Sequence, residues 1–146
     1  MDINVALNEV FVKVFKNITA IEEQVIRTEE YQKATANDMH VIEAIGVGKP
    51  KNMTSVAKAL SVTTGTLTIS VNSLVKKGFV ERVRSEEDRR VVLISLTEKG
   101  KQIFMKHRKF HEELVNGIVN QLDDEEKVLL KKVLLNLNQY FKDMQK

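Results

Sequence analysis

The chain has 146 residues, the size of one domain, and 42% of them are apolar, which is enough for a sizeable core. It contains no Cys, which excludes a disulfide framework, a thiolate zinc site and a cysteine nucleophile. The net charge is only +3, but residues 76–109 hold eleven Lys and Arg against five Asp and Glu. This local excess indicates a polyanionic partner, with a solvated charged face as the alternative.

Residues 3–31 carry a helical pattern of apolar side chains. These side chains recur at alternating intervals of four and three residues, which places them on one stripe close to a coiled-coil seam. The stripe consists of Leu7, Phe11, Val14, Ile18, Ile21 and Val25. The opposite face carries polar residues, Glu22 and Glu23 among them. This spacing predicts one long helix over 3–31.

A second, shorter helix is expected over 37–46. Asn37 or Asp38 can act as its N-cap, because both side chains accept hydrogen bonds from the first turn of a helix. Gly46 can end the helix, because glycine tolerates the backbone that follows a last turn. Residues 48–52, which include the only Pro of the chain, are then predicted to form a loop.

Two helices joined by a tight turn follow. The first is predicted over 54–61, with Thr54 as its N-cap. The second is predicted over 64–77, with Thr63 as its N-cap and an apolar stripe on one side. Gly78 stands directly after Lys76 and Lys77, where a left-handed residue commonly ends a helix.

The pattern becomes strand-like after residue 78. Segments 79–84 and 91–96 are rich in β-branched and apolar residues, and six polar residues separate them, which predicts a hairpin with a charged tip. A helix over 98–120 with Thr97 as its N-cap is expected next, and a last helix begins at the acidic run 122–126. That last helix is apolar over much of its circumference, so a second copy of the chain is expected to cover it.

The expected fold class is therefore mainly α with a small β-hairpin wing. A short helix, a tight turn and a second helix, followed at once by a two-stranded wing, form a winged helix-turn-helix, whose second helix enters the DNA major groove. We expect a single domain over 1–146, with the DNA-binding region at 37–100. The segments 1–31 and 101–146 are expected to supply dimerisation helices.

The helix over 64–77 and its N-cap hold residues expected to bind DNA. They are Thr63, Thr64, Gly65, Thr66, Thr68, Ile69, Asn72 and Lys76. Asn72 can pair with adenine through two hydrogen bonds, and Thr or Ile methyl groups can contact the thymine methyl. No Arg lies between Thr63 and Lys77, so the usual guanine contact is missing and an A·T-rich operator is predicted. The alternative is that the threonines only cap and cover the helix.

Arginines gather in the predicted hairpin. Arg82 and Arg84 share one face of its first strand, and Asp88, Arg89 and Arg90 occupy its tip. A narrow A·T-rich minor groove attracts an inserted Arg, and an Asp two residues away can orient that Arg before binding. We predict that Arg90 enters the minor groove and that Asp88 orients it, while Arg82, Arg84 and Arg89 contact phosphates. A solvated hairpin tip is the alternative.

Residues 60–101 resemble the core of MarR-family regulators. The matching residues of the wing are the tip Asp88-Arg89-Arg90, then Leu93, Leu96-Thr97 and Gly100. The remaining helices fit the family order across nearly the whole chain. The resemblance implies a homodimer joined by its first and last helices, which binds a pseudo-palindromic operator on double-stranded DNA and usually represses transcription.

Four segments are also similar to the fatty-acid-synthesis repressors of that family (FabT-like). They are residues 37–46, 62–68, 82–92 and 106–115. This similarity implies repression of lipid-synthesis genes, with an acyl chain on acyl carrier protein as corepressor. The aliphatic faces of the first, second and fifth predicted helices would then line an acyl tunnel, and Lys106, Arg108 and Lys109 would meet the acidic carrier. Plain core packing of those faces is the alternative.

Other functions have less support in the sequence. His107 and His111 are four residues apart, a spacing that can bind zinc, but His40 is the only other His, so we expect neither a metal nor a cofactor. No Gly-rich phosphate loop or catalytic triad order is present, so no enzyme is expected. The alternatives are a sensor of a small aromatic compound or a metal, an architectural DNA-binding protein, and a protein-interaction module. We expect no membrane segment and a cytoplasmic location.

Overall fold

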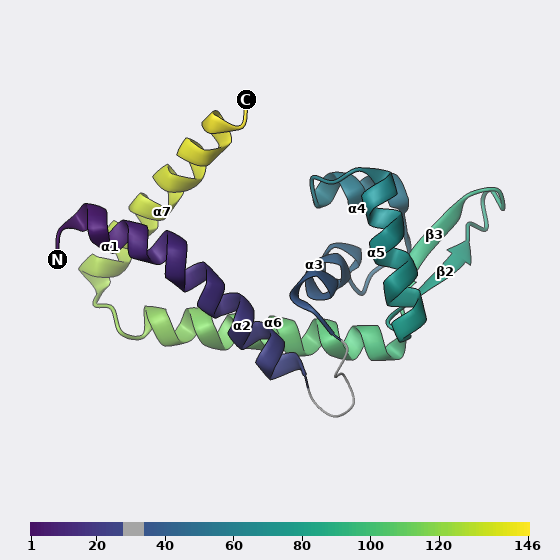
Figure 1. Ribbon diagram of the computed structural model, residues 1–146, viewed down its shortest axis with the longest axis horizontal. Helices are drawn as coiled ribbons and strands as arrows, with labels where there is room; N and C mark the ends of the chain where they lie inside the picture. Colours follow the sequence, from purple (N-terminus) through teal and green to yellow (C-terminus); the bar gives the residue numbers. More distant parts are fainter. Residues whose placement is uncertain (28–33) are drawn as a thin grey trace. The chain divides into compact units, whose positions relative to one another are not determined.

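Helices and one small antiparallel sheet make up the computed structural model, which describes residues 1–27 and 34–146 (Figure 1). The chain divides into two units, Met1–Phe110 and His111–Lys146. Helix α6 (Glu98–Val119) runs through the boundary, and helix α7 (Asp124–Met144) belongs to the second unit. The fold class predicted from the sequence is therefore confirmed.

The N-terminal helix is shorter than predicted. It consists of α1 (Ile3–Glu9), one π-helical segment η1 (Val10–Val14) and α2 (Phe15–Ile26). Arg27 already leaves helical geometry with ψ of 85°, so the predicted end at 31 is wrong, and residues 28–31 lie outside the described part of the chain.

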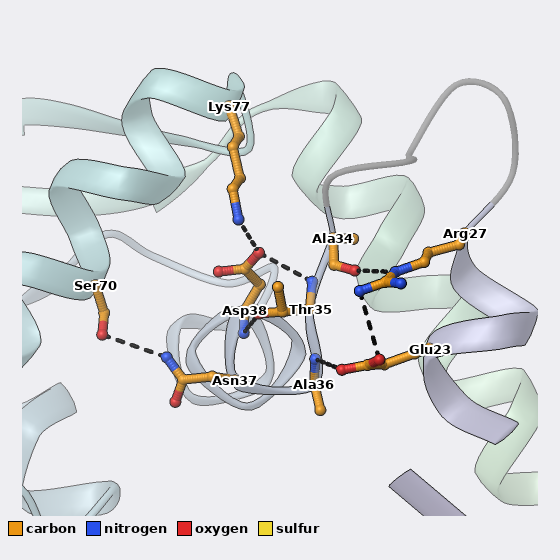
Figure 2. Close-up of polar contacts among 9 residues, drawn as sticks. All are labelled: Glu23, Arg27, Ala34, Thr35, Ala36, Asn37, Asp38, Ser70 and Lys77. Atoms are coloured by element: carbon orange, nitrogen blue, oxygen red, sulfur yellow. Dashed lines mark hydrogen bonds and ion pairs between the residues drawn. The ribbon is translucent and has the colours of Figure 1, made fainter. Parts of the chain in front are cut away.

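Tertiary contacts explain where α2 ends. The Arg27 Nε group donates to the Ala34 carbonyl oxygen at 3.2 Å, and the Ala36 backbone N–H donates to the Glu23 carboxylate at 3.1 Å (Figure 2). Arg27 and Glu23 also form an ion pair across one helical turn at 3.4 Å. These contacts bind the end of α2 to the start of the next helix, a preference that the periodicity of apolar residues cannot reveal.

Helix α3 (Ala36–Ile45) is capped by Thr35, so the prediction of Asn37 or Asp38 as N-cap is wrong. The Asp38 backbone N–H donates to the Thr35 hydroxyl at 3.1 Å, and the Thr35 N–H donates to the Asp38 carboxylate at 3.0 Å (Figure 2). This reciprocal capping box satisfies two backbone donors at once, which a cap at Asn37 would not do. Gly46 ends the helix with φ of +70°, as predicted.

A third strand replaces part of the predicted loop at 48–52. Strand β1 (Lys51–Asn52) pairs with β3 (Val92–Leu96), and β3 pairs with β2 (Val80–Arg84), which gives the order β1-β3-β2. Asn52 then caps α4 (Met53–Ala59), because its side chain accepts from the Ser55 N–H at 2.7 Å. The prediction of Thr54 as that cap is wrong, since Thr54 lies inside the helix.

The helix-turn-helix and wing agree closely with the sequence pattern. Helix α5 covers Thr64–Lys77, Thr63 caps it by accepting from the Thr66 N–H at 3.1 Å, and Gly78 follows it with φ of +84°. Ser61 has φ of +55° in the turn between α4 and α5, a left-handed conformation that keeps this turn short. The β2–β3 hairpin projects beyond α5 (Figure 1).

The core of the first unit fixes α5 from behind. Leu67, Val71 and Leu74 are no more than 1% exposed. They pack in one cluster with the apolar residues of α3, α4, the inner side of the sheet and the start of α6. The opposite face of α5 is thereby left to solvent on a rigid base.

A polar group lies inside this unit where a polar surface was expected. Glu22 of α2 is 4% exposed, so its predicted place on the outer face is wrong. Its Oε1 atom lies 3.2 Å from Nε2 of the buried His107 on α6, and His107 Nδ1 faces Oε2 of Glu43 on α3 at 3.6 Å. The buried carboxylate is stabilised by this partner, because an isolated charge in a core is costly. Three helices therefore meet at His107.

Several helices keep apolar side chains in solvent within one chain. Helix α1 has no buried residue, and Leu7 and Val25 of the predicted seam are each 45% exposed. Helix α7 likewise has no buried residue, with Leu134 49% and Phe141 42% exposed. None of the helices within 1–27 and 34–146 has the length and apolar character that a membrane crossing requires.

Candidate nucleic-acid interface

The exposed face of α5 carries the residues that the sequence pointed to. Thr64, Gly65, Thr68, Ile69, Asn72 and Lys76 are all exposed. Ile69 is 74% exposed, although it is a large apolar residue in a well-packed unit. The structure thus brings the predicted set onto one side of one helix, opposite the buried stripe.

Some threonine hydroxyls of this helix have local partners. Thr63 Oγ1 accepts from the Thr66 N–H at 3.1 Å and lies 3.0 Å from Thr66 Oγ1. The Thr68 hydroxyl donates to the Thr64 carbonyl oxygen at 2.7 Å. Thr63 therefore acts as the N-cap of α5, as predicted, and the DNA contacts of these threonines stay a prediction.

Polar contacts from α3 hold α5 at two positions along its length. The Asn37 side chain donates to the Ser70 hydroxyl at 3.4 Å, and Lys77 Nζ donates to Asp38 Oδ2 at 2.6 Å (Figure 2). The Asp38 side chain is 6% exposed, so loss of Lys77 would leave a buried carboxylate short of its cation. Ser70 and Lys77 lie two turns apart, so the two contacts resist tilting of α5 on its base.

The wing tip contains the pair expected from the sequence. Arg90 Nε donates to Asp88 Oδ1 at 3.0 Å, Nη2 donates to Oδ2 at 3.1 Å, and the Arg90 backbone N–H donates to Oδ1 at 3.0 Å. The Arg90 side chain is 91% exposed. A two-point contact of this kind fixes the plane of the guanidinium group while leaving it open to a ligand.

The same contacts decide how the tip responds to acid. The side-chain and backbone hydrogen bonds from Arg90 hold the pKa of the Asp88 carboxyl below its ordinary value. Such a carboxyl remains ionised at every pH above its ordinary range, and the pair is lost only as the pH falls through the lowered pKa. The orientation of Arg90 is therefore constant through neutral pH.

Arg84 supports the tip from the strand below it. Its Nη1 group donates to the carbonyl oxygen of Arg89 at 2.9 Å. The Ser85 N–H donates to the Val91 carbonyl, and the Val91 N–H donates to the Asp88 carbonyl, each at 2.9 Å. Arg84 thus shapes the turn that presents Arg90, a role that its place in the sequence did not indicate.

One contact joins the wing to the recognition helix. Arg82 Nη2 on β2 donates to Asn72 Oδ1 on α5, and both residues are exposed. These two residues lie ten positions apart in elements of different type, so no local sequence pattern pairs them. Only the packing of β2 beside α5 brings them together.

The sequence is similar to those of known transcriptional regulators. A family model described as Transcriptional regulator SarA/Rot matches residues 26–107. The SarZ regulator of Staphylococcus saprophyticus is 34% identical over 102 residues, which are 69% of this chain and 68% of that protein. The chain spans only 55–62% of the length of four other curated relatives, among them the HTH-type regulators YpoP and YhjH of Bacillus subtilis.

Solved structures agree over almost the whole chain. Streptococcus pneumoniae FabT, crystallised in complex with DNA, is 39% identical with a TM-score of 0.87, and the match covers 97% of this chain and 99% of that one. A mutant MarR from E. coli complexed with operator DNA is 25% identical with a TM-score of 0.67, and the match covers 94% and 99%. The chain therefore belongs to the MarR/SarA family of winged helix-turn-helix proteins, which are DNA-binding transcriptional regulators and not enzymes.

Proposed function

We propose that this protein is a homodimeric repressor that binds a pseudo-palindromic operator, with α5 in the major groove and Arg90 in the adjacent minor groove. The main support for this proposal is the Asp88–Arg90 pair at the exposed wing tip, together with the exposed face of α5. Arg84 and Arg89 would add phosphate contacts. Two copies would place their recognition helices about one helical turn, roughly 34 Å, apart on DNA.

Dimerisation is supported by apolar surface that one chain leaves in solvent. Leu7 and Val25 in the first unit, and Leu134 and Phe141 in the second, are each more than two-fifths exposed. Surfaces of this kind on a monomer generally mark an interface with another protein. A second copy is the occupant that we propose, because a palindromic site requires two equivalent heads.

A dimer-breaking variant tests this part of the proposal. Leu134→Glu with Phe141→Glu should give a monomer, because two charges would be buried in the interface, and operator affinity should fall about 100-fold or more when the second half-site is lost. Light scattering coupled to size exclusion measures the mass. Asn136→Glu, which adds charge at an exposed position of the same helix, should remain dimeric. A double variant that stays a dimer would contradict the proposal.

We further propose that the regulated genes serve fatty-acid synthesis and that acyl-loaded acyl carrier protein is the corepressor. The support is the similarity to FabT over nearly the full chain. The aliphatic sides of α2, α3 and α6 would supply the acyl site. Lys106 and Lys109 are exposed on α6 and suit an acidic carrier, whereas Arg108 lies 4.8 Å over the Phe104 ring and contacts Glu43 at 3.4 Å.

A gel-shift titration with acyl-loaded carrier protein tests the corepressor. Acyl carrier protein bearing a long chain should raise operator affinity about 5- to 150-fold, the range of ordinary allosteric coupling, and the unloaded carrier should not. A response to a small aromatic compound or to zinc instead would support the rival sensors. Equal affinity for operator and random duplex would overturn the repressor proposal in favour of an architectural protein.

A further inference from the structure

One face of the β2–β3 wing packs on the core and continues toward α5. In the β2–β3 register, Val80, Arg82 and Arg84 stand opposite Leu96, Ile94 and Val92. Val80, Ile94 and Leu96 are at most 2% exposed, so this is the side of the sheet that packs on the core. Residues directly opposite in an antiparallel pair share a face, so Arg82 is on that same side at the point where the core ends.

The Arg82 guanidinium therefore reaches the exposed stripe of the recognition helix. It donates to the side-chain oxygen of Asn72. Asn72 stands one helical turn from Thr68 and one from Lys76, so all three lie on one side of α5. Helix α5 contains no Arg of its own, and β2 delivers one to its outward face.

This contact changes what Asn72 can recognise. A two-point contact with adenine requires the amide oxygen as acceptor and the amide nitrogen as donor. The Asn72 oxygen accepts from Arg82 through one of its two lone pairs, so the amide group is already held by the wing. The predicted adenine contact of Asn72 would have to share this oxygen with Arg82.

The arrangement suits guanine instead. Guanine presents two acceptors, N7 and O6, in the major groove, and the planar fork of an arginine matches both. Arg has several N–H donors, so one can be held by Asn72 while others bind the base. Orientation by Asn72 before binding lowers the entropy lost on contact, as Asp88 does for Arg90 at the wing tip.

We infer that Arg82, positioned by Asn72, is a specificity-determining residue that reads one guanine in each operator half-site. This inference rests on the proposed placement of α5 in the major groove. It adds a required G·C pair, where Arg82 meets the groove, to the A·T-rich operator predicted from the sequence. Asn72 is then a positioning residue and not a base reader.

Selection from a randomised duplex pool, followed by titration of single-base operator variants, tests the inference on the full-length protein. The wild-type protein should enrich one G·C pair per half-site and bind its replacement about 5- to 150-fold less tightly. Arg82→Ala should lose that preference at this one position and keep the others. Asn72→Ala should reduce the preference at the same position and leave every adenine preference unchanged.

Arg89→Ala is the matched control, because it removes the same charge from the wing and keeps the Arg89 backbone oxygen that accepts from Arg84. It should weaken all sequences alike and reduce the salt dependence of binding, which is the behaviour of a backbone contact. Melting curves of the three variants should match the wild type, since all three side chains are exposed.

Different experimental results would contradict the guanine assignment of Arg82 and the proposed repressor function. An Arg82→Ala variant that loses affinity equally for every sequence would overturn the guanine assignment and make Arg82 a phosphate contact. Loss of an adenine preference in Asn72→Ala would overturn it as well. A wild-type protein that enriches no sequence would overturn the proposed repressor function itself.

Discussion

Arg90→Ala is expected to lower operator affinity by about 10- to 100-fold at physiological salt, the effect of losing about 1.4–2.8 kcal/mol of binding free energy. Arg90 stands 91% exposed at the wing tip, and Asp88 fixes its guanidinium plane through two hydrogen bonds. A narrow A·T-rich minor groove has enhanced negative potential that favours such a side chain. Titration by fluorescence anisotropy measures the change.

The dependence of the affinity loss on operator sequence distinguishes insertion of Arg90 into the minor groove from general electrostatic attraction to DNA. The effect of Arg90→Ala should be largest on operators with A·T-rich flanks and should shrink when G·C pairs widen the minor groove there. Arg89→Ala is the matched control: it removes an equal charge one residue away, and the contact of Arg84 with the Arg89 backbone oxygen survives the change. Full operator affinity in Arg90→Ala would refute the wing assignment.

Asp88→Asn separates orientation from charge. It removes a negative charge near DNA, which alone would strengthen binding, but it also replaces one acceptor of the two-point contact with a donor. If orientation of Arg90 dominates, this variant binds more weakly than the wild type in spite of its more favourable charge. Tighter binding would show that Asp88 has no orienting role.

The recognition helix and the wing were predictable because their signals are local. Thr63 as N-cap, Gly78 in the left-handed conformation and the stripe through Leu67, Val71 and Leu74 all follow from rules that span one or two helical turns. The Asp88–Arg90 pair is similarly local, with one residue between its two members. Such features depend only on residues close together in the sequence.

The two misplaced N-caps are local errors, since Thr35 and Asn52 each accept from a residue three positions away. The other errors involve partners distant in sequence. Glu22 is buried because His107 lies opposite it, 85 positions along the chain. Strand β1 is too short for a pattern of its own and exists because β3 offers it an edge. The Arg82–Asn72 contact likewise depends on β2 packing beside α5. No periodicity in the sequence carries these pairings, because each one joins residues that only the tertiary fold brings together.

Gly100 shows how a residue of the family wing motif acts through packing alone. It lies in the first turn of α6, and a Cβ atom built there would stand 2.0 Å from the Phe79 carbonyl oxygen and 3.3 Å from the Leu96 Cβ. The Phe79 oxygen accepts from the Thr97 N–H at 3.1 Å, and the Thr97 hydroxyl donates to the Gly78 oxygen at 2.6 Å. The helix start is thereby pressed against the base of the wing.

Gly100→Ala is expected to destabilise the protein by about 3 kcal/mol, at the upper end for overpacking, because the obstructing atom is backbone and cannot rotate away. The gain in helix propensity, about 1 kcal/mol, offsets only part of the clash. Thermal unfolding should shift down by roughly 6–12 °C for a chain of this size. Operator affinity should fall too, since relief of the clash moves the start of the β2–β3 hairpin, which carries Arg82 on β2 and Arg90 at its tip.

Gly117→Ala provides the matched control in the same helix. A Cβ at Gly117 meets no atom within 4 Å, so this change should raise stability by up to about 1 kcal/mol through helix propensity alone. The two alanines therefore have opposite expected signs, and the difference between their melting temperatures isolates the close approach at Phe79. Equal melting temperatures would mean that α6 and the wing base separate without cost, and that rigid support from α6 does not position the arginines of the wing.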